Sequence, residues 1–173
     1  MDEKFQTIIF LVRHGETDRT YLLDPTIDGE RVLTQEGRDQ IKKVGEYIAN
    51  FAPVAIYSSP RLRTIQTAEV IEEVAKIPRE IEQKQELYEI YSPGDYQALE
   101  NIIPKFFDEL ITKHAGCHIV CTTHQDVIQG GLEAFDLTDE EKDFPCLEAE
   151  MYRLVFAGHK LVECQKLTPA ASL

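Results

Sequence analysis

The sequence has few of the features that mark membrane, secreted or disordered proteins. Its longest early apolar run, Thr7–Val12, is far shorter than the roughly 20 apolar residues of a membrane-spanning helix. The run follows an acidic start, Met1–Glu3, which lacks the basic region of a secretory signal peptide. Glycine and proline number only 9 and 8 among 173 residues, and 43% of the residues are hydrophobic, which is typical of a folded soluble protein. We therefore expect a single globular domain, residues 1–173, in the cytoplasm.

Positive charge is also scarce. Lysine and arginine total 18 against 31 aspartate and glutamate residues, which gives a net charge of −13. This balance disfavours binding to nucleic acid and to anionic membranes, so we expect neither as a partner. The four cysteines include no CxxC pair, and we expect them to be reduced and mostly buried in the core.

Several motifs of phosphate chemistry are missing. The sequence contains no P-loop GxxxxGK[ST], no GxSxG and no GxGxxG. A cysteine phosphatase would need an arginine six positions after its cysteine, but those four positions hold Thr123, Val127, Tyr152 and Ala170. Thiol phosphatase chemistry is therefore excluded on this pattern.

Short apolar runs alternate with segments of helical periodicity. The expected strands are Thr7–Val12, Val54–Ser58, a brief one near Glu80–Glu82, Cys117–Thr122, and a terminal hairpin of Met151–Phe156 with Lys160–Cys164. The expected helices are Gln35–Asn50, Arg61–Ala75, Tyr96–Leu110 with a kink or division at Pro104, and a helical face over Val127–Phe135. This alternation predicts an α/β fold with a mainly parallel sheet and an antiparallel hairpin at one edge.

Basic side chains follow the predicted strands at the edge where such sheets bind ligands. Arg13 and His14 come directly after the first strand, Arg61 and Arg63 shortly after the second, and His124 after Cys117–Thr122. Guanidinium groups present rigid forks of N–H donors that match phosphate or carboxylate oxygens. The sequence therefore predicts an anion site, with phosphate as the favoured ligand.

The arginines also decide what the histidines can do. A cluster of guanidinium groups repels divalent cations, so we expect no metal cofactor. The same charges lower the pKa of a nearby imidazole and keep it neutral, able to attack a bound phosphoryl group. The pattern favours a phosphohistidine intermediate on either His14 or His124.

Four segments together resemble the histidine phosphatase superfamily, which includes phosphoglycerate mutases and many small phosphatases. Leu11–Thr17 (LVRHGET) resembles the family signature, and Leu33–Gly37 is similar to the start of its first helix. Ser58–Ala68 (SSPRLRTIQTA) is similar to its second phosphate-binding segment, and Cys121–Ile128 (CTTHQDVI) to the segment with the second catalytic histidine. The resemblance covers nearly the whole chain and implies a three-layer sandwich, with helices on both faces of the sheet.

The resemblance implies roles for four of the strand-end residues. His14 would be the nucleophile that carries the phosphoryl group. Arg13 and Arg63 would grip the phosphate, and Arg63 is favoured over Arg61 by its spacing from the QTA sequence that follows. His124 would hydrogen-bond the same oxygens and stabilise the transferring group.

Other assignments leave alternatives open. Leu87–Ile90 resembles the acid segment of the family, which makes Glu89 the candidate proton donor, with Glu86 as the alternative. Thr17 either helps to bind the phosphate or caps a turn, and Arg61 either touches the ligand or forms a surface ion pair. The residues expected to be structural or exposed are Asp126 at a helix start, His114, His118 and His159.

The departures from the family pattern bear on the activity. Phosphoglycerate mutases carry a Trp and an Asn after the signature, where this chain has Arg19 and Thr20, so mutase activity is disfavoured. The interval Pro78–Gly116 leaves little room for an inserted lid. The length and the run Tyr91–Asp95 are similar to the SixA-type phosphatases that act on protein phosphohistidine.

These observations predict a metal-independent phosphatase, a hydrolase that acts on a phosphomonoester or on protein phosphohistidine. Its partner would be a phosphorylated small molecule or a phosphoprotein, recognised by walls from Asp18–Arg31 and Glu86–Tyr96. A mutase is the nearest alternative enzyme. A module that binds a phosphorylated ligand with little turnover is the alternative from another class.

Overall fold

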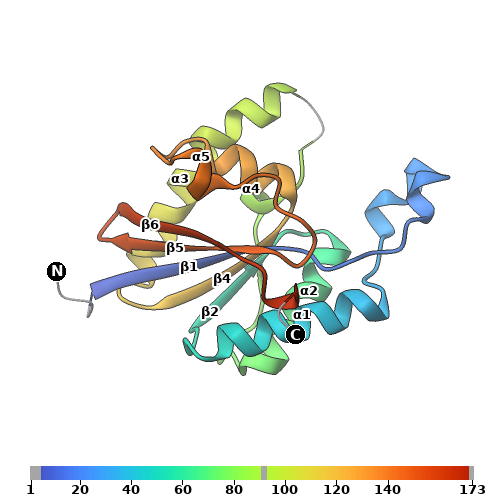
Figure 1. Ribbon diagram of the computed structural model, residues 1–173, viewed down its shortest axis with the longest axis horizontal. Helices are drawn as coiled ribbons and strands as arrows, with labels where there is room; N and C mark the ends of the chain where they lie inside the picture. The colour runs from blue at the N-terminus through green and yellow to red at the C-terminus, as the bar shows by residue number, and fades with distance from the viewer. Residues whose placement is uncertain (1–4, 91–92, 172–173) are drawn as a thin grey trace.

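A six-stranded mixed sheet forms the centre of the protein, for which a computed structural model describes residues 5–90 and 93–171 (Figure 1). The strands lie in the order β3-β2-β4-β1-β5-β6, with bounds β1 Gln6–Arg13, β2 Ala55–Ser58, β3 Glu82–Gln83, β4 His118–Thr123, β5 Met151–Ala157 and β6 Lys160–Leu167. The helices are α1 Gln35–Ala49, α2 Leu62–Ala75, α3 Pro93–Lys113, α4 Gln125–Leu132 and α5 Asp139–Lys142. Strands β1 to β4 pair in parallel, whereas β5 and β6 form an antiparallel hairpin beside β1. The predicted fold class is confirmed.

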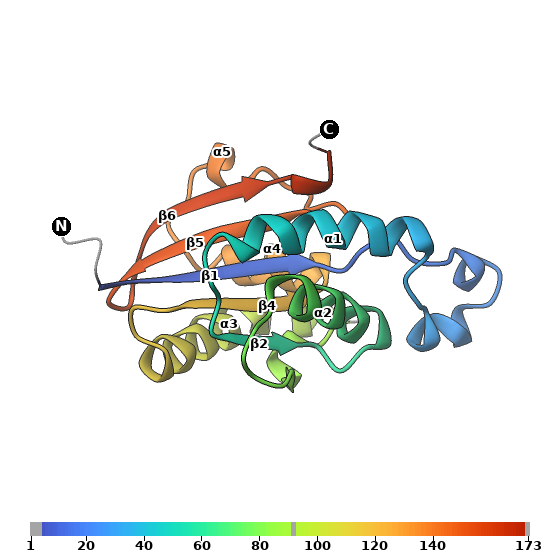
Figure 2. The same cartoon turned by 90° about the horizontal axis from the view of Figure 1, so that it is seen from below.

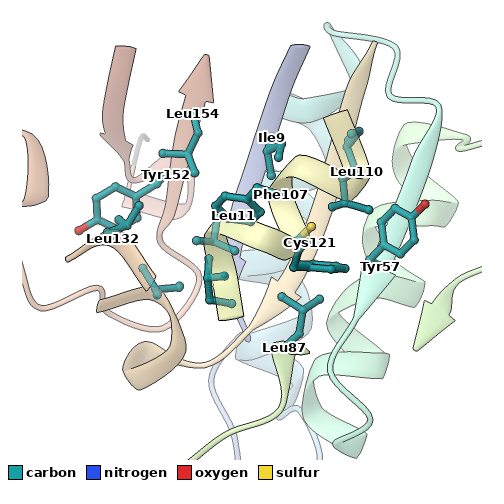
Figure 3. Packing of buried hydrophobic residues seen from close by; sticks show 14 of the residues in the cluster. Ile9, Leu11, Tyr57, Leu87, Phe107, Leu110, Cys121, Leu132, Tyr152 and Leu154 are labelled. Carbon is teal, nitrogen blue, oxygen red and sulfur yellow. The ribbon is translucent and has the colours of Figure 1, made fainter. Parts of the chain in front are cut away.

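Helices cover both faces of the sheet, and the side chains of β1 alternate between them. Ile9 and Leu11 pack in a cluster with α3 and α4, whereas Phe10 and Val12 pack in a second cluster with α1 and α2. Figures 1 and 2 show the two helical layers, and Figure 3 shows the first cluster around Leu11, where Phe107 of α3 meets the sheet. Full burial of each such side chain stabilises the fold by about 1.5–3 kcal/mol, which explains why β1 is apolar throughout.

The loop after β1 is held in place by the start of α1. The Thr34 hydroxyl caps this helix by accepting the Gly37 N–H at 2.9 Å. A Cβ at Gly37 would lie 2.1 Å from the Glu16 carbonyl oxygen, so only glycine allows this approach. The Gly15 N–H also donates to the Thr67 hydroxyl of α2, at 3.2 Å. Both helices therefore fix the backbone directly after His14.

Some details differ from the expectations. Of the expected kink or division at Pro104, the division does not occur, because helix α3 continues past it. Ile103, Phe106 and Phe107 around the proline are all buried, and their packing offsets the lost backbone hydrogen bond. The brief third strand lies at Glu82–Gln83. Tyr91 and Ser92, which begin the run similar to SixA-type phosphatases, lie outside the described residues.

The fold bears on two expectations from the sequence, the lack of a membrane-spanning segment and the burial of the cysteines. Within the described ranges, every helix is too short or too polar to cross a membrane. As expected, most of the cysteines are core residues: Cys121, Cys146 and Cys164 are buried and Cys117 is half-buried.

Candidate active site

A cleft of about 310 Å³ lies at the carboxyl ends of β1 and β4. It is lined by Arg13, His14, Arg31, Arg63, Glu89, Tyr96, His124, Gln125, Asp126 and Gln129. The cleft brings together the predicted nucleophile, the two predicted phosphate-binding arginines, the second histidine and the predicted acid.

The register of two parallel strands places the histidines side by side. Arg13 of β1 pairs with Thr123 of β4, and the His14 N–H donates to the Thr123 carbonyl at 3.1 Å. His14 and His124 each follow one residue after this pair, and their ring centroids are 5.6 Å apart. Residues 110 positions apart in the chain thus share one site because their strands are neighbours.

The His14 ring has a defined tautomer. Its Nδ1 lies 2.9 Å from the Gly15 carbonyl oxygen, and a carbonyl can only accept, so Nδ1 carries the proton and Nε2 the lone pair. The residue is only 4% exposed. Burial above all, and then the charges of Arg63 and Arg13, lower the pKa of His14 to about 3. The imidazole is therefore neutral at physiological pH.

His124 is held through its other ring nitrogen. Its Nε2 lies 2.8 Å from the Ser59 hydroxyl, and the Ser59 N–H donates to the Thr122 carbonyl at 3.0 Å, which ties the end of β2 to β4. Burial, and then the neighbouring His14 and arginines, hold the pKa of His124 well below its usual value. Its Nδ1 is buried without a hydrogen-bond partner among residues 5–90 and 93–171.

The two predicted phosphate-binding arginines are fixed by backbone and side-chain acceptors. Arg13 donates to the Cys146 carbonyl at 2.8 Å and to Gln125 Oε1 at 3.0 Å. Arg63 is 2% exposed and donates to the Asp28 carbonyl at 3.1 Å. The Nε atoms of both side chains are buried and, within the described parts of the chain, without a hydrogen-bond acceptor. With His124 Nδ1, they are buried polar atoms of three cleft-lining residues that lack a partner within the described parts of the chain.

Glu89 lies between the arginines and His124. Its carboxylate forms ion pairs with Arg63 and, at 2.5 Å, with Arg61 Nε, and Glu89 Oε2 is 3.8 Å from His124 Nδ1. The segment that carries Glu89 is anchored at both ends. The Thr123 hydroxyl donates to the Leu87 carbonyl at 2.7 Å, and a second bond joins Ile90 to α4.

Three other candidates lie beside the cleft rather than in its lining. The Thr17 hydroxyl accepts from Arg31 Nε at 3.0 Å, so Thr17 supports a cleft arginine. Arg61 pairs with Glu89 and lies over the Tyr88 ring, with its guanidinium carbon 4.8 Å from the ring centroid. Glu86 lines a neighbouring cavity.

The other histidines lie elsewhere, as expected. His114 is buried against the Tyr57 hydroxyl at 2.7 Å, His118 contacts the Phe51 carbonyl, and the exposed His159 pairs with Asp108.

The comparison with protein families gives a match that spans more than half of the chain. The family model of the histidine phosphatase superfamily (branch 1) matches residues 9–105. The chain belongs to the histidine phosphatase superfamily.

Individual relatives agree with this assignment. A probable phosphatase of Schizosaccharomyces pombe is 41% identical over 80 residues, which are 44% of this chain and 27% of that protein. The chain spans about a third of the length of the curated relatives it matches.

Solved structures support the fold. The crystal structure of phosphoglycerate mutase from Bacillus anthracis str. Sterne gives a TM-score of 0.73 at 15% identity, covering 93% of this chain and 92% of that one. The protein histidine phosphatase SixA complexed with tungstate gives 0.71 at 17% identity, with 94% and 97% covered.

This member of the histidine phosphatase superfamily also has cleft residues that sequence reasoning missed. Gln125 and Gln129 were not predicted, whereas Arg31 and Tyr96 were predicted only as the ends of two wall segments. The segment that ends at Arg31 has no periodicity from which a direction could be inferred, and the direction of Tyr96 depends on how α3 packs against α4. Gln125 could have been predicted from the sequence, because it directly follows His124 at the start of α4. Asp126 occupies the expected helix start and also lines the cleft.

Proposed function

We propose that this protein is a metal-independent phosphatase that transfers a phosphoryl group to His14 and then to water. The observation that carries the proposal is the bond between His14 Nδ1 and the Gly15 carbonyl, which leaves Nε2 as a neutral, fixed nucleophile. The phosphatase names of the relatives support the same reaction class. The positive charges of Arg13, Arg31 and Arg63 oppose a divalent cation at this position and favour an anionic substrate.

In the first step, the phosphoryl oxygens accept hydrogen bonds from Arg13 Nε, Arg63 Nε and His124 Nδ1. For His124 to donate through Nδ1, its Nε2 accepts the proton of the Ser59 hydroxyl. The His14 Nε2 lone pair attacks phosphorus, and the bond from phosphorus to the leaving oxygen breaks. Because these donors are buried and already oriented, they stabilise the charge of the transition state without reorganisation.

Glu89 is paired with Arg61 and Arg63 in the free enzyme, so it first takes up the proton of the substrate's phosphate monoanion and then gives that proton to the leaving oxygen. A bound phosphate competes with Glu89 for the N–H groups of Arg63, which releases the carboxyl group toward the substrate. Proton transfer of this kind contributes about 10²- to 10⁴-fold to a rate. In the second step, Glu89 takes a proton from water, the water oxygen attacks phosphorus, and the bond to His14 Nε2 breaks. Inorganic phosphate leaves, and His14 returns to its neutral form.

The first experiment is hydrolysis of p-nitrophenyl phosphate in excess chelator by the wild type and by His14→Ala. His159→Ala is a matched control, because His159 is exposed at the opposite end of the sheet, in the turn between β5 and β6. We expect the wild type and His159→Ala to turn over in chelator and His14→Ala to lose activity. Full activity in a folded His14→Ala variant would overturn the mechanism, and loss of activity in chelator would overturn its metal independence.

A further inference from the structure

The two sides of the cleft carry opposite charge. Arg13, Arg31 and Arg63 come from β1, from the segment that follows it and from α2. Tyr96, Asp126 and Gln129 come from the helices α3 and α4, and we call these three residues the α3–α4 wall. Among the described lining residues, Asp126 is the charged group that α3 and α4 contribute.

The Asp126 carboxylate is firmly placed. It lies in the first turn of α4, is half-buried, and its Oδ2 accepts the Ile90 N–H at 2.8 Å. Burial raises the pKa of Asp126, while backbone N–H groups, first that of Ile90 and then that of Val127, favour the ionised form. The bond to Ile90 also links this carboxylate to the segment that carries Glu89.

Further carboxylates surround the α3–α4 wall. The pKa of Tyr96 is raised, first by burial and then by the negative charges of Glu133, Glu100 and Asp126. A neighbouring cavity of about 340 Å³ is bordered by Glu86 and also by the apolar Leu99 and Ile102. Glu89 lines both this cavity and the cleft. A group that extends from the arginines past Glu89 therefore enters a region of negative potential.

The direction of the reaction places the leaving group on this side. The attacking and leaving atoms lie roughly in line through phosphorus, so the leaving oxygen points away from His14. In the proposed first step the phosphoryl oxygens bind His124 Nδ1, Arg13 Nε and Arg63 Nε, which have no hydrogen-bond partner within the described residues. Glu89, the proposed proton donor, must reach the leaving oxygen, and Asp126 accepts a hydrogen bond from Ile90, the residue directly after Glu89.

We propose that the α3–α4 wall selects substrates by the charge of the leaving group, with Asp126 as the specificity-determining residue. The favoured substrates are phosphomonoesters of amino alcohols, whose ammonium group pairs with Asp126. Phosphates of neutral alcohols are the next best substrates, and phosphates with a carboxylate on the leaving group are disfavoured. The inference rests on the proposed function, since it assumes that the phosphate binds at the arginines.

The test is the affinity of three phosphonates that differ only in the end group of a short chain. 2-Aminoethylphosphonate, propylphosphonate and 2-carboxyethylphosphonate end in an ammonium, a methyl and a carboxylate group. Their carbon–phosphorus bond is not hydrolysed by this mechanism, so calorimetry measures binding without turnover. We expect the wild type to bind the ammonium compound about tenfold more tightly than the carboxylate compound, with the methyl compound between them.

Asp126→Asn removes the charge and keeps an oxygen that can accept the Ile90 N–H. We expect the affinity ratio of the ammonium and carboxylate compounds to fall to about one in this variant. Asp108→Asn is the matched control, because Asp108 is an exposed carboxylate beside His159, far from the cleft, and this variant should keep the wild-type ratio. The ratio cancels any common effect on phosphonate binding.

Each contrary result has its own meaning. A carboxylate compound that binds as tightly as the ammonium compound, or a ratio unchanged in a folded Asp126→Asn variant, would overturn the inference. So would binding of inorganic phosphate with no binding of the three phosphonates, because the leaving-group side would then not admit them. If inorganic phosphate itself did not bind, the proposed function would fail, and the inference with it.

Discussion

His14 and His124 lie one residue beyond a directly paired position of two neighbouring parallel strands, with ring centroids 5.6 Å apart. The pairing of Arg13 with Thr123 fixes this relationship, and the bond from the His14 N–H to the Thr123 carbonyl extends it. The core that packs β1 between two helical layers therefore sets the geometry of the cleft. Changes to that packing should lower stability and activity together, whereas changes to the cleft residues should mainly lower activity.

Gly37→Ala tests how the start of α1 supports the site. The new Cβ would lie 2.1 Å from the Glu16 carbonyl oxygen, a backbone atom that cannot rotate away. We expect a loss of stability of about 1–3 kcal/mol, as for overpacking elsewhere, together with lower activity at temperatures where the variant is folded. Urea denaturation and phosphatase assays measure the two effects. Glu46→Ala, at an exposed position of the same helix, should change neither; equal behaviour of the two variants would contradict the proposed support.

Arg63→Lys tests whether catalysis needs the several N–H donors of the guanidinium group or only its positive charge. Lysine keeps the positive charge but lacks the Nε donor and the second N–H group that reaches Asp28. We expect kcat/KM to fall about 10²-fold, comparable to removal of one donor from an oxyanion site. Arg153→Lys on β5, paired with Glu163 away from the cleft, is the control. A variant at position 63 with wild-type kcat/KM would show that charge alone suffices.

Glu89→Gln and Glu86→Gln decide between the two candidate acids. If Glu89 donates the proton, its variant should lose about 10²- to 10⁴-fold in kcat on an alkyl phosphate. The loss should be much smaller on p-nitrophenyl phosphate, because its leaving group needs little protonation. Glu86 borders the neighbouring cavity, so its variant should keep kcat on both substrates. The reverse pattern would transfer the role to Glu86.

The buried histidines should make stability depend on pH. The folded-state pKa of His14 is about 3, below its usual 6.5, so the unfolded chain takes up this proton more readily. The contribution to stability is therefore complete above pH 6.5 and is lost as pH falls toward 3, by up to about 1.4 kcal/mol per unit. The pKa of His124 is shifted in the same direction.

Urea denaturation at about pH 7 and about pH 5 measures this dependence. The wild type should be less stable at the lower pH, and His14→Asn should show a smaller difference between the two values. An equal difference in both proteins would mean that His14 is not held neutral by the fold.

The positions of His14 and His124 could be predicted, because each depends only on where a short apolar strand ends in the sequence. A fully apolar run such as Thr7–Val12 ends where its residues leave the core, so the position of His14 follows from the sequence. The same holds for His124 after its strand. Tyr96 and Gln129 could not be placed, because their direction depends on how α3 and α4 pack against each other. Pro104 is the converse case: its local preference predicts a kink or a division, but α3 continues across it with buried neighbours.

In the proposed reaction the phosphoryl group passes through His14 Nε2, and trapping the phosphorylated enzyme tests this step. The enzyme would be mixed with a substrate, quenched in base after a few milliseconds, and digested for mass spectrometry under conditions that preserve phosphohistidine. We expect a base-stable, acid-labile phosphoryl group on His14, absent from His14→Ala and present in His159→Ala. A phosphoryl group on another residue, or turnover without any phosphorylated protein, would contradict it.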